Sequence, residues 1–511
     1  MKKRSLMLVL MLVMALMLFA CNGRPVRGEF VIPEGGFDTT QEVTITFHHT
    51  MGANLREKLD LALEDFKEIY PNITVVHEQI GSYDDVRDNN NTLIVEDLQP
   101  NLSYCYPDHV ALYNLAKVVV TLDGFIESDM EVKDANGNVI EKLGLSQEQK
   151  DDFIQGYYEE GKQFGDGKMY TLPFSKSTEV LYYNKTFFEK HGITVPDHWF
   201  STGENDTTSM EYVCAKIKEI DPKSTPLGYD SAANWFITMT EQLGSPYTSA
   251  KEGEKFQFLN DTNIDFVSKF RQWYLNGWVT TQDLYGAYTS GLFVNIPTET
   301  NPVCSYMSIG SSAGATHQRP AKDGNAYPFE VGIATIPQMD QNNAKVISQG
   351  PSVCIFNNKD PQKVLASWLL LKYLTTNASF QAEFSMASGY VPVIKSVVDY
   401  EATRIKKDAQ GNAVVGEDGK PVYETYKPYQ EFLEKADGGD YVTSLSAKVC
   451  MDQEKAYYTS PAFNGSSEAR DQVNEIINGA FTIPENTANI KAAITQIFQD
   501  AIDECEYNFG K

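Results

Sequence analysis

The 511-residue sequence contains few of the motifs that mark catalytic or metal-binding proteins. It has no His-Glu-x-x-His zinc motif and no glycine-rich nucleotide fingerprint, so no such signal points to a zinc peptidase or a nucleotide-binding enzyme. The one pair of adjacent histidines, His48-His49, lies in a predicted strand, where neighbouring side chains point to opposite faces and cannot readily hold one ion. We therefore expect neither a metal nor a cofactor.

Long apolar runs are also scarce, with one exception at the N-terminus. A basic head, Lys-Lys-Arg, precedes an apolar stretch of about 13 residues, shorter than the roughly 20 that a membrane-spanning helix needs. The stretch ends in "LFAC" (18–21), which is similar to a bacterial lipobox. We expect residues 1–20 to be a lipoprotein signal peptide and Cys21 to carry the lipid that anchors the chain outside the cytoplasm, on the cell membrane. The alternative is a plain signal peptide.

Positive charge is deficient: the formal net charge is −26 and becomes about −29 once the basic head is removed. A field of that sign repels nucleic acids and other polyanions, so we expect no nucleic acid as a partner. The six cysteines beyond residue 21 include no Cys-x-x-Cys pair. They read as buried small side chains or as members of a disulfide that spacing alone cannot assign.

The remaining sequence predicts an α/β protein. Residues 21–41 are rich in glycine and proline without a helical or strand period, which predicts a flexible tether before a folded part that begins at about Glu42. Strand alternation at 42–49, helical spacing at 53–70 and a second strand at 72–81 predict a βαβ unit, and hence a parallel sheet. Asn-Gly, Gly-Asn and Asp-Gly steps predict hairpin insertions at 132–144 and 405–424.

Polar and aromatic residues gather where predicted strands end. The stretches are "GSYDD" (81–85), "PFSKST" (173–178), "SIGSSAG" (308–314) and "SGYVPV" (388–393). In α/β sheets small molecules bind beyond the carboxyl ends of strands, and aromatic faces and hydroxyls suit a sugar. Each stretch is also an ordinary turn or cap when taken alone.

Together these motifs resemble the family 1 extracellular solute-binding proteins of ABC importers, in the branch that includes glycerol phosphate and sugar binders. The carriers, in order, are "FHHTMG", "YPNITVV", "GSYDD", "LPFSKSTEVLYYNKTFFEKHGI", "GSSAG", "VGIATIP", "QGPSVCIF" and "FSMASGYVPV". The resemblance implies an α/β fold of two lobes with a hinge and a ligand cleft between them. We expect lobe 1 to comprise 42–172 plus 303–358, and lobe 2 to comprise 173–302 plus 359–511.

The resemblance also implies the residues that contact the solute. By motif these are Tyr83, Ser177 with its neighbour Thr178, Ser311 or Ser312, Gly350 and Tyr390. Asp108 lies beside a position where such proteins often place an acidic group, although Pro107 takes the matching place. Trp235 falls near a tryptophan that packs on the solute.

One departure from the glycerol phosphate binders bears on the solute. Where those proteins hold it with an arginine near the C-terminus, this sequence aligns Phe463, and Arg470 lies beyond. Phosphate favours a forked, permanently charged partner, so the departure favours a neutral mono- or oligosaccharide. Lys176 is the remaining candidate cation, and its alternative interpretation is a solvated lysine.

We therefore expect a lipid-anchored solute-binding subunit of an ABC importer that captures a carbohydrate or a glycerol derivative without chemistry and delivers it to permease subunits. We also expect a monomer. Two alternatives remain: a surface glycoside hydrolase, since 69 carboxylates leave room for an acid and base pair, and an adhesion or scaffold lipoprotein with a degenerate cleft.

Overall fold

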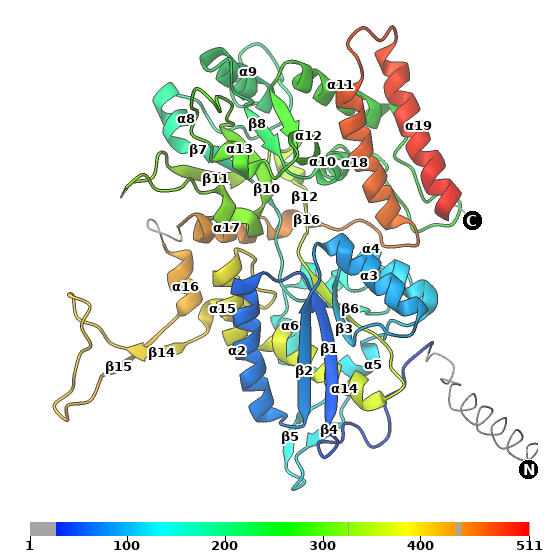
Figure 1. The fold of residues 1–511 in the computed structure, drawn as a ribbon, viewed down its shortest axis with the longest axis vertical. Coiled ribbons are helices and arrows are strands. Elements are labelled where there is room, and N and C mark those ends of the chain that lie inside the picture. Colours follow the sequence, from blue (N-terminus) through cyan, green and yellow to red (C-terminus); the bar gives the residue numbers. More distant parts are fainter. Residues whose placement is uncertain (1–26, 325, 436–440, 510–511) are drawn as a thin grey trace, which may run out of the picture.

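The fold consists of two mixed β-sheets, each at the centre of its own lobe. The structure is a computed structural model and describes residues 27–324, 326–435 and 441–509. One sheet has the order β2-β1-β3-β13-β6 and the other the order β11-β7-β10-β8-β9. The lobes lie one above the other along the longest axis (Figure 1). The predicted α/β fold with two lobes is confirmed, whereas the sheets are mixed rather than all parallel.

Lobe 1 contains the sheet that begins with the predicted βαβ unit. Val43 pairs in parallel with Ile73, and the connecting helix buries Leu59, Ala62 and Phe66 on one face, as its spacing predicts. The strands of this lobe are β1 (Val43–His49), β2 (Ile73–Gln79), β3 (Leu102–Cys105), β4 (Glu131–Lys133), β5 (Val139–Lys142), β6 (Thr171–Pro173) and β13 (Ser352–Ile355). Its helices are α2 (Ala53–Ile69), α3 (Tyr83–Val95), α4 (Pro107–Tyr113), α5 (Asp123–Ile126), α6 (Gln147–Asp152), α7 (Gln155–Glu160), α14 (Pro361–Thr376), α15 (Ala378–Ser388) and α16 (Pro428–Leu433).

Lobe 2 contains the second sheet. "EVLYYN" forms its strand β7, with Tyr182 buried and Tyr183 half-buried, and leads directly into the helix α8. The strands are β7 (Glu179–Asn184), β8 (Leu227–Tyr229), β9 (Val279–Thr281), β10 (Met307–Ser311) and β11 (Val331–Thr335). The helices are α8 (Lys185–His191), α9 (Met210–Ile220), α10 (Ala232–Leu243), α11 (Asp261–Leu275), α12 (Gln282–Tyr285), α13 (Ser290–Phe293), α18 (Ser466–Thr482) and α19 (Ile490–Phe509).

Three chain segments cross between the lobes, and they divide the sequence differently from the predicted ranges. The crossings are residues 174–178, residues 346–351 with β12 (Val346–Ile347), and the run from α17 (Tyr441–Asp452) through β16 (Tyr457–Tyr458) to α18. Residues 307–335, expected in lobe 1, form β10 and β11 of the second sheet. Residues 361–433, expected in lobe 2, contribute α14, α15 and α16 to the first core. Local periodicity carries no information on where a chain changes lobes, which explains the difference.

The N-terminal segment packs on lobe 1 earlier than expected. Arg27 Nη1 donates to the Ala116 carbonyl at 2.9 Å, Gly28 N donates to the Lys117 carbonyl at 2.7 Å, and Phe37 is buried in the core. The expected free tether of residues 21–41 is therefore wrong for residues 27–41. Residues 1–20 and Cys21 lie outside the described residues. Within the described ranges, no helix combines the length and the apolarity needed to cross a membrane.

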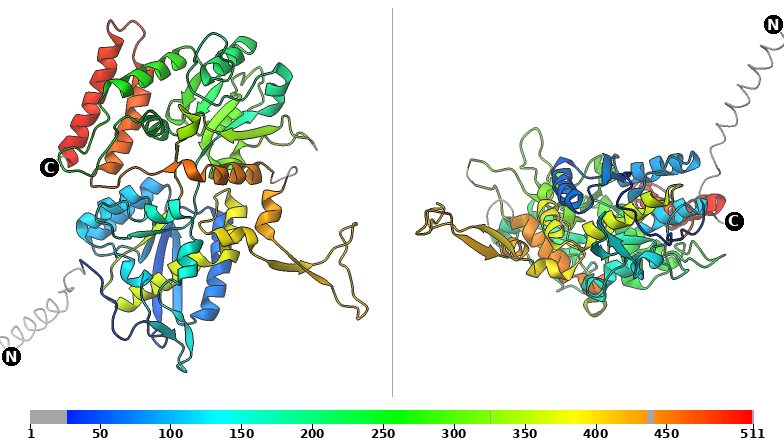
Figure 2. Two further views of the ribbon diagram at one scale, coloured as in Figure 1. Left: turned by 180° about the vertical axis from the view of Figure 1, so that it is seen from behind. Right: turned by 90° about the horizontal axis from the view of Figure 1, so that it is seen from below.

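Both predicted hairpins are present. β4 pairs with β5, and β14 (Ala402–Ile405) pairs with β15 (Tyr423–Tyr426), in each case antiparallel. The second hairpin projects away from the body on the side of α16 (Figures 1 and 2). Neither hairpin contributes a residue to the interlobe pocket described next.

Candidate functional site

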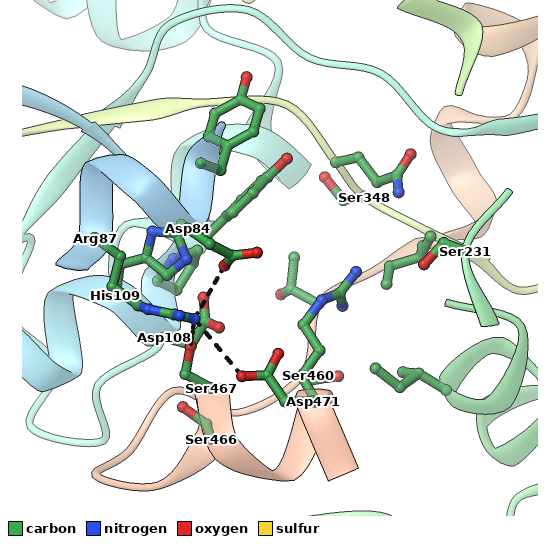
Figure 3. Close-up of a pocket in the computed structure, with 18 of the residues that line it drawn as sticks. Asp84, Arg87, Asp108, His109, Ser231, Ser348, Ser460, Ser466, Ser467 and Asp471 are labelled. Atoms are coloured by element: carbon green, nitrogen blue, oxygen red, sulfur yellow. Dashed lines mark hydrogen bonds and ion pairs between the residues drawn. The ribbon is translucent and has the colours of Figure 1, made fainter. Parts of the chain in front are cut away.

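A pocket of about 360 Å³ lies between the lobes, where the crossing segments meet. Lobe 1, lobe 2 and two of the crossings all contribute to its wall. The lining residues are Ser82, Tyr83, Asp84, Arg87, Tyr106, Pro107, Asp108, His109, Glu160, Ser231, Ile237, Tyr247, Thr248, Tyr288, Ile347, Ser348, Gln349, Thr459, Ser460, Pro461, Ser466, Ser467, Arg470 and Asp471. Figure 3 shows the polar side chains of α3, α4 and α18 converging on it.

Two helices of lobe 1 begin at the pocket. Ser82 caps α3 and forms a reciprocal capping box with Asp85, so the first turn of α3 is fixed at the wall. Pro107 starts α4, where its missing N–H costs nothing. The capping sequences "SYDD" and "YPDH" therefore place Tyr83 and Asp108 at the pocket.

Tyrosines supply the aromatic part of the wall. The rings of Tyr83 and Tyr106 lie with centroids 4.8 Å apart, and the hydroxyl of Tyr83 lies 3.2 Å from that of Tyr390. Tyr247 and Tyr288 line the side of lobe 2. Each ring offers an apolar face with a polar tip, the combination that suits a sugar ring and its hydroxyls.

Charged groups bridge the two lobes at the pocket. Arg87 of α3 lies 3.0 Å from an Asp84 oxygen and 3.8 Å from an oxygen of Asp471 on α18, and it donates to Ser467 Oγ at 3.3 Å (Figure 3). Arg470, also of α18, donates to Asn234 Oδ1. The lining contains four carboxylates, of Asp84, Asp108, Glu160 and Asp471, against two guanidinium groups. A solute with two or more negative charges is therefore disfavoured.

A buried acid lies behind Arg470. Tyr229 donates to Glu179 Oε2 at 2.7 Å. Burial raises the pKa of Glu179 to about 7, although hydrogen bonds from Tyr229 and Asn234 and the charge of Arg470 oppose that shift. The chain of contacts from Arg470 through Asn234 to Glu179 links the pocket to the first strand of the second sheet.

Several buried polar atoms of the lining have no hydrogen-bond partner among the described residues. They are His109 Nδ1, Thr248 Oγ1, Gln349 Oε1 and Ser460 Oγ. Burial lowers the pKa of His109, so its ring is neutral at neutral pH. Because buried polar groups are nearly always paired in proteins, these four atoms mark unmet hydrogen-bonding capacity in the residues of the wall. The atoms themselves are covered by protein, so they are not counted among the groups that face a solute.

The residues expected to contact the solute fall into three groups. Tyr83 and Asp108 line the pocket, and Tyr390 lies directly behind Tyr83. Ser177, Thr178, Ser311, Ser312 and Gly350 belong to the crossings or their neighbours but are not part of the lining. Ser311 Oγ donates to Ser177 Oγ at 3.2 Å, and Thr178 Oγ1 donates to the Ile347 carbonyl at 2.7 Å, so these hydroxyls hold the crossings together.

Trp235 lies in the core of lobe 2 rather than at the pocket. It has no exposed surface, and its ring stacks between Phe270, with centroids 3.9 Å apart, and Tyr229, with centroids 4.7 Å apart. A solute therefore cannot reach either face of the ring. Its position on α10, two residues before the lining residue Ile237, explains why its motif falls so near the site.

Ser312 has the spacing of a nucleophile elbow, since residues 310–314 read Gly-Ser-Ser-Ala-Gly. Its side chain is buried, and Ser312 Oγ accepts from Thr178 N at 3.4 Å. Instead of standing exposed above a sheet, Ser312 is enclosed where the second sheet meets α17: its carbonyl accepts from Ser446. The motif therefore serves packing here.

The structure corrects the comparison with arginine-containing binders. Phe463 is buried against Phe256. Arg470, expected beyond the site, and Arg87, which no motif singled out, both line the pocket. The serine pair "SS" before "EAR" at the start of α18 was the signal available in the sequence, since a helix that begins at the pocket presents its first two turns there. The described residues contain no group of three or more potential metal ligands.

Comparisons with known proteins identify bacterial solute-binding proteins as the relatives of this chain. The profile of a family described as "Bacterial extracellular solute-binding protein" matches residues 62–413. The sn-glycerol-3-phosphate-binding periplasmic protein UgpB of Yersinia pseudotuberculosis is 22% identical over 372 residues, which cover 70% of this chain and 76% of that protein. UgpB of Escherichia coli K12 is 22% identical over 368 residues, covering 70% and 75%.

Solved structures of low identity share the fold. UgpB from Mycobacterium tuberculosis in complex with glycerophosphocholine has a TM-score of 0.60 at 16% identity and covers 90% of this chain and 99% of its own. The ABC substrate-binding protein Lmo0181 of Listeria monocytogenes with cycloalternan has a TM-score of 0.62 at 15% identity, covering 90% and 98%. Maltose-bound MalE3 of T. maritima has a TM-score of 0.61 at 15% identity, covering 90% and 99%.

Proposed function

Because the chain belongs to the family of bacterial extracellular solute-binding proteins, we propose that it captures a carbohydrate or an uncharged glycerol derivative in the interlobe pocket. It then delivers the solute unchanged to the permease subunits of an ABC importer. The observation that carries this proposal is a pocket built from both lobes, whose wall combines tyrosine rings with hydroxyl, amide and carboxylate groups. The structural neighbours solved with cycloalternan and maltose support the carbohydrate class, whereas the UgpB relatives are named for the anionic sn-glycerol 3-phosphate.

The pocket favours an uncharged solute over a phosphorylated one. Arg87 is surrounded by Asp84, Asp88 and Asp471, so its charge is already balanced within the protein. A phosphate would need a cation free of such partners, in a wall that is acidic in sum. Arg87 therefore acts as a fixed donor to hydroxyls rather than as part of a phosphate clamp. Arg470, which donates to the neutral side chain of Asn234, is a single cation in a wall with four carboxylates.

Anchoring to the outer face of the membrane completes the proposal. A lipid on Cys21 would hold the body at the membrane, where the permease lies. Since residues 27–41 pack on lobe 1, only about five residues separate that cysteine from the folded body, which keeps lobe 1 close to the bilayer. Metabolic labelling with a palmitate analogue tests this part: incorporation into wild type but not into a Cys21→Ala variant is expected. Equal labelling of the wild type and the variant would contradict a lipid anchor on Cys21.

Dialysis against a solute panel tests capture without chemistry. The panel contains maltose, maltotriose, glycerol, glycerol 3-phosphate and glycerophosphocholine, and mass spectrometry identifies what the protein retains. We expect an intact neutral sugar or polyol. Shortened products from maltotriose would instead support the glycoside hydrolase, which neither the family nor the solved structures support. Retention of nothing in the panel would contradict the proposed solute class.

A further inference from the structure

Lys176 lies in the first crossing and is not part of the pocket lining, so its role has to be found in its other contacts. Its side chain has no exposed surface, so it is not a solvated lysine. Its ammonium donates to Glu160 Oε1 at 2.8 Å, to the Gly350 carbonyl at 3.2 Å and to Ser352 Oγ at 3.2 Å. Those three bonds use all three donors of an ammonium group, so Lys176 has none left for a solute.

Glu160, the last residue of α7, differs from Lys176 in that it lines the pocket. Its side chain is only 3% exposed, yet it lines the pocket. Oε1 is bonded to Lys176, whereas among the described residues Oε2 accepts only from Ser348 Oγ, at 3.3 Å. That separation is long for a hydroxyl bonded to a carboxylate, which is typically about 2.5 to 2.7 Å. A carboxylate accepts about four hydrogen bonds, so Glu160 retains acceptor capacity at the pocket wall.

We propose that Glu160 is a specificity-determining residue that accepts a hydrogen bond from a hydroxyl of the solute, and that Lys176 is the positioning residue that holds it. This inference rests on the proposed function and names what the solute must present: a donor, at the point where the lobes join. An anionic group at the same point meets a buried carboxylate and is rejected. Lys176, the candidate cation for an anionic solute, is thus bonded to Glu160, which would accept a hydrogen bond from a neutral solute.

The crossings fix the orientation of Glu160. Lys176 exchanges backbone hydrogen bonds with Val391, at 3.1 and 2.7 Å, while Ser177 exchanges them with Gln349, at 3.0 and 2.9 Å. Lys176 is therefore tied to the segment that carries Ser348, Gly350 and Ser352. Any rotation of one lobe on the other changes the angle between these segments. The acceptor at Glu160 is consequently aligned only in the lobe arrangement that the crossings impose.

Three variants test the proposal: Lys176→Met, Glu160→Gln and the double variant. Each single change leaves a buried charge unpaired, so both should lower the melting temperature of the solute-free protein, and the double variant should recover much of that loss. Binding is then measured with maltotriose, or with the panel member that the wild type retains most. The double variant should bind at least tenfold more weakly than the wild type despite its recovered stability, because a charged acceptor has been replaced by an amide.

A matched pair provides the control. Lys372, which is buried, and Glu141, whose side chain is 33% exposed, form another ion pair of lobe 1, 2.7 Å apart, and neither lines the pocket. Lys372→Met combined with Glu141→Gln should leave the affinity unchanged. If the Lys176 and Glu160 double variant regains wild-type affinity along with its stability, the pair is merely structural and the inference is wrong. Absence of binding by the wild type to every probe would instead overturn the proposed function, and this inference with it.

Discussion

At the scale of single residues, side chains at the starts of α3, α4 and α18 supply much of the pocket wall. Tyr83 follows the Ser82 cap of α3, packs on Tyr106 and shares a hydroxyl contact with Tyr390. It is held from two sides and still lines the pocket. Such a ring presents a fixed face, so its removal costs binding energy without opening the core.

We expect Tyr83→Ala to weaken binding of the retained solute by about 1 to 3 kcal/mol, because a stacking face is lost. Isothermal titration measures the change. Tyr83→Phe separates the ring from its hydroxyl and should cost less. Tyr423→Ala, on the projecting hairpin, is the matched control and should leave the affinity unaltered. Equal affinities for Tyr83→Ala and the wild type would place the solute elsewhere.

Trp235 leads to the opposite expectation. Because its ring is stacked in the core of lobe 2, Trp235→Ala should lower the free energy of unfolding by about 3 to 5 kcal/mol. Denaturant titration of the solute-free protein measures this. A variant that unfolds like the wild type but binds the solute poorly would contradict this expectation and indicate that Trp235 contacts the solute.

Glu179 is expected to make the free energy of unfolding depend on pH. Its pKa in the folded protein is raised to about 7 from an ordinary value of 4.5, so the folded state holds the proton more tightly than the unfolded state. The stability that this group contributes is therefore present at pH 4.5 and below, and it is lost as the pH rises to about 7. The shift corresponds to a loss of about 3 kcal/mol.

Glu179→Gln should remove this slope, because the amide keeps an oxygen for Tyr229 and has no proton to lose. The test is the difference in unfolding free energy between variant and wild type at pH 5, 6, 7 and 8. We expect the variant to gain relative to the wild type across that range. A difference that does not change with pH would contradict the raised pKa.

At the scale of elements, the crossings depend on one glycine. Gly350 has a φ of +91°, and a Cβ there would clash with the Ser175 carbonyl oxygen and lie 2.8 Å from Lys176 Cα. Only glycine allows the first and second crossings to approach this closely. The motif "QGPS" thus marks a hinge contact, whereas the resemblance implied a solute contact.

Gly350→Ala should lower the free energy of unfolding by about 2 kcal/mol or more, from backbone strain and crowding together. Gly411→Ala is a matched control: its φ is +84°, but nothing lies within 4 Å of the added Cβ. The control carries the strain without the crowding, so it should cost less in the same denaturant titration. Equal losses at both glycines would mean that the crossings tolerate the Cβ.

Some elements of the fold could be predicted from the sequence and others could not. The βαβ unit, both hairpins and "EVLYYN" were predictable because each is encoded by local period or turn chemistry. The membership of β10, β11 and α14 in their lobes was not, since it depends on where the chain crosses. Arg87 and Arg470 were missed for the same reason: only the tertiary fold brings α3 to α18.

At the scale of the whole molecule, two hydrophobic cores flank a site to which both lobes contribute. Lobe 1 supplies Tyr83, Tyr106 and Asp108, lobe 2 supplies Tyr247, and the crossings supply Gln349 and Ser460. The overall charge of −26 and the acidic wall act in the same direction, against anionic solutes. The proposed solute capture would therefore depend on the lobe arrangement, which the hydrogen bonds of Lys176 and Ser177 across the crossings help to fix.

The most direct test is isothermal titration calorimetry of the wild-type protein with maltotriose, maltose, glycerol and glycerol 3-phosphate at neutral pH. The account predicts saturable binding of at least one neutral solute, with glycerol 3-phosphate at least tenfold weaker. Tight binding of glycerol 3-phosphate with no heat from the neutral members would contradict it, and would make Arg87 and Arg470 a phosphate site.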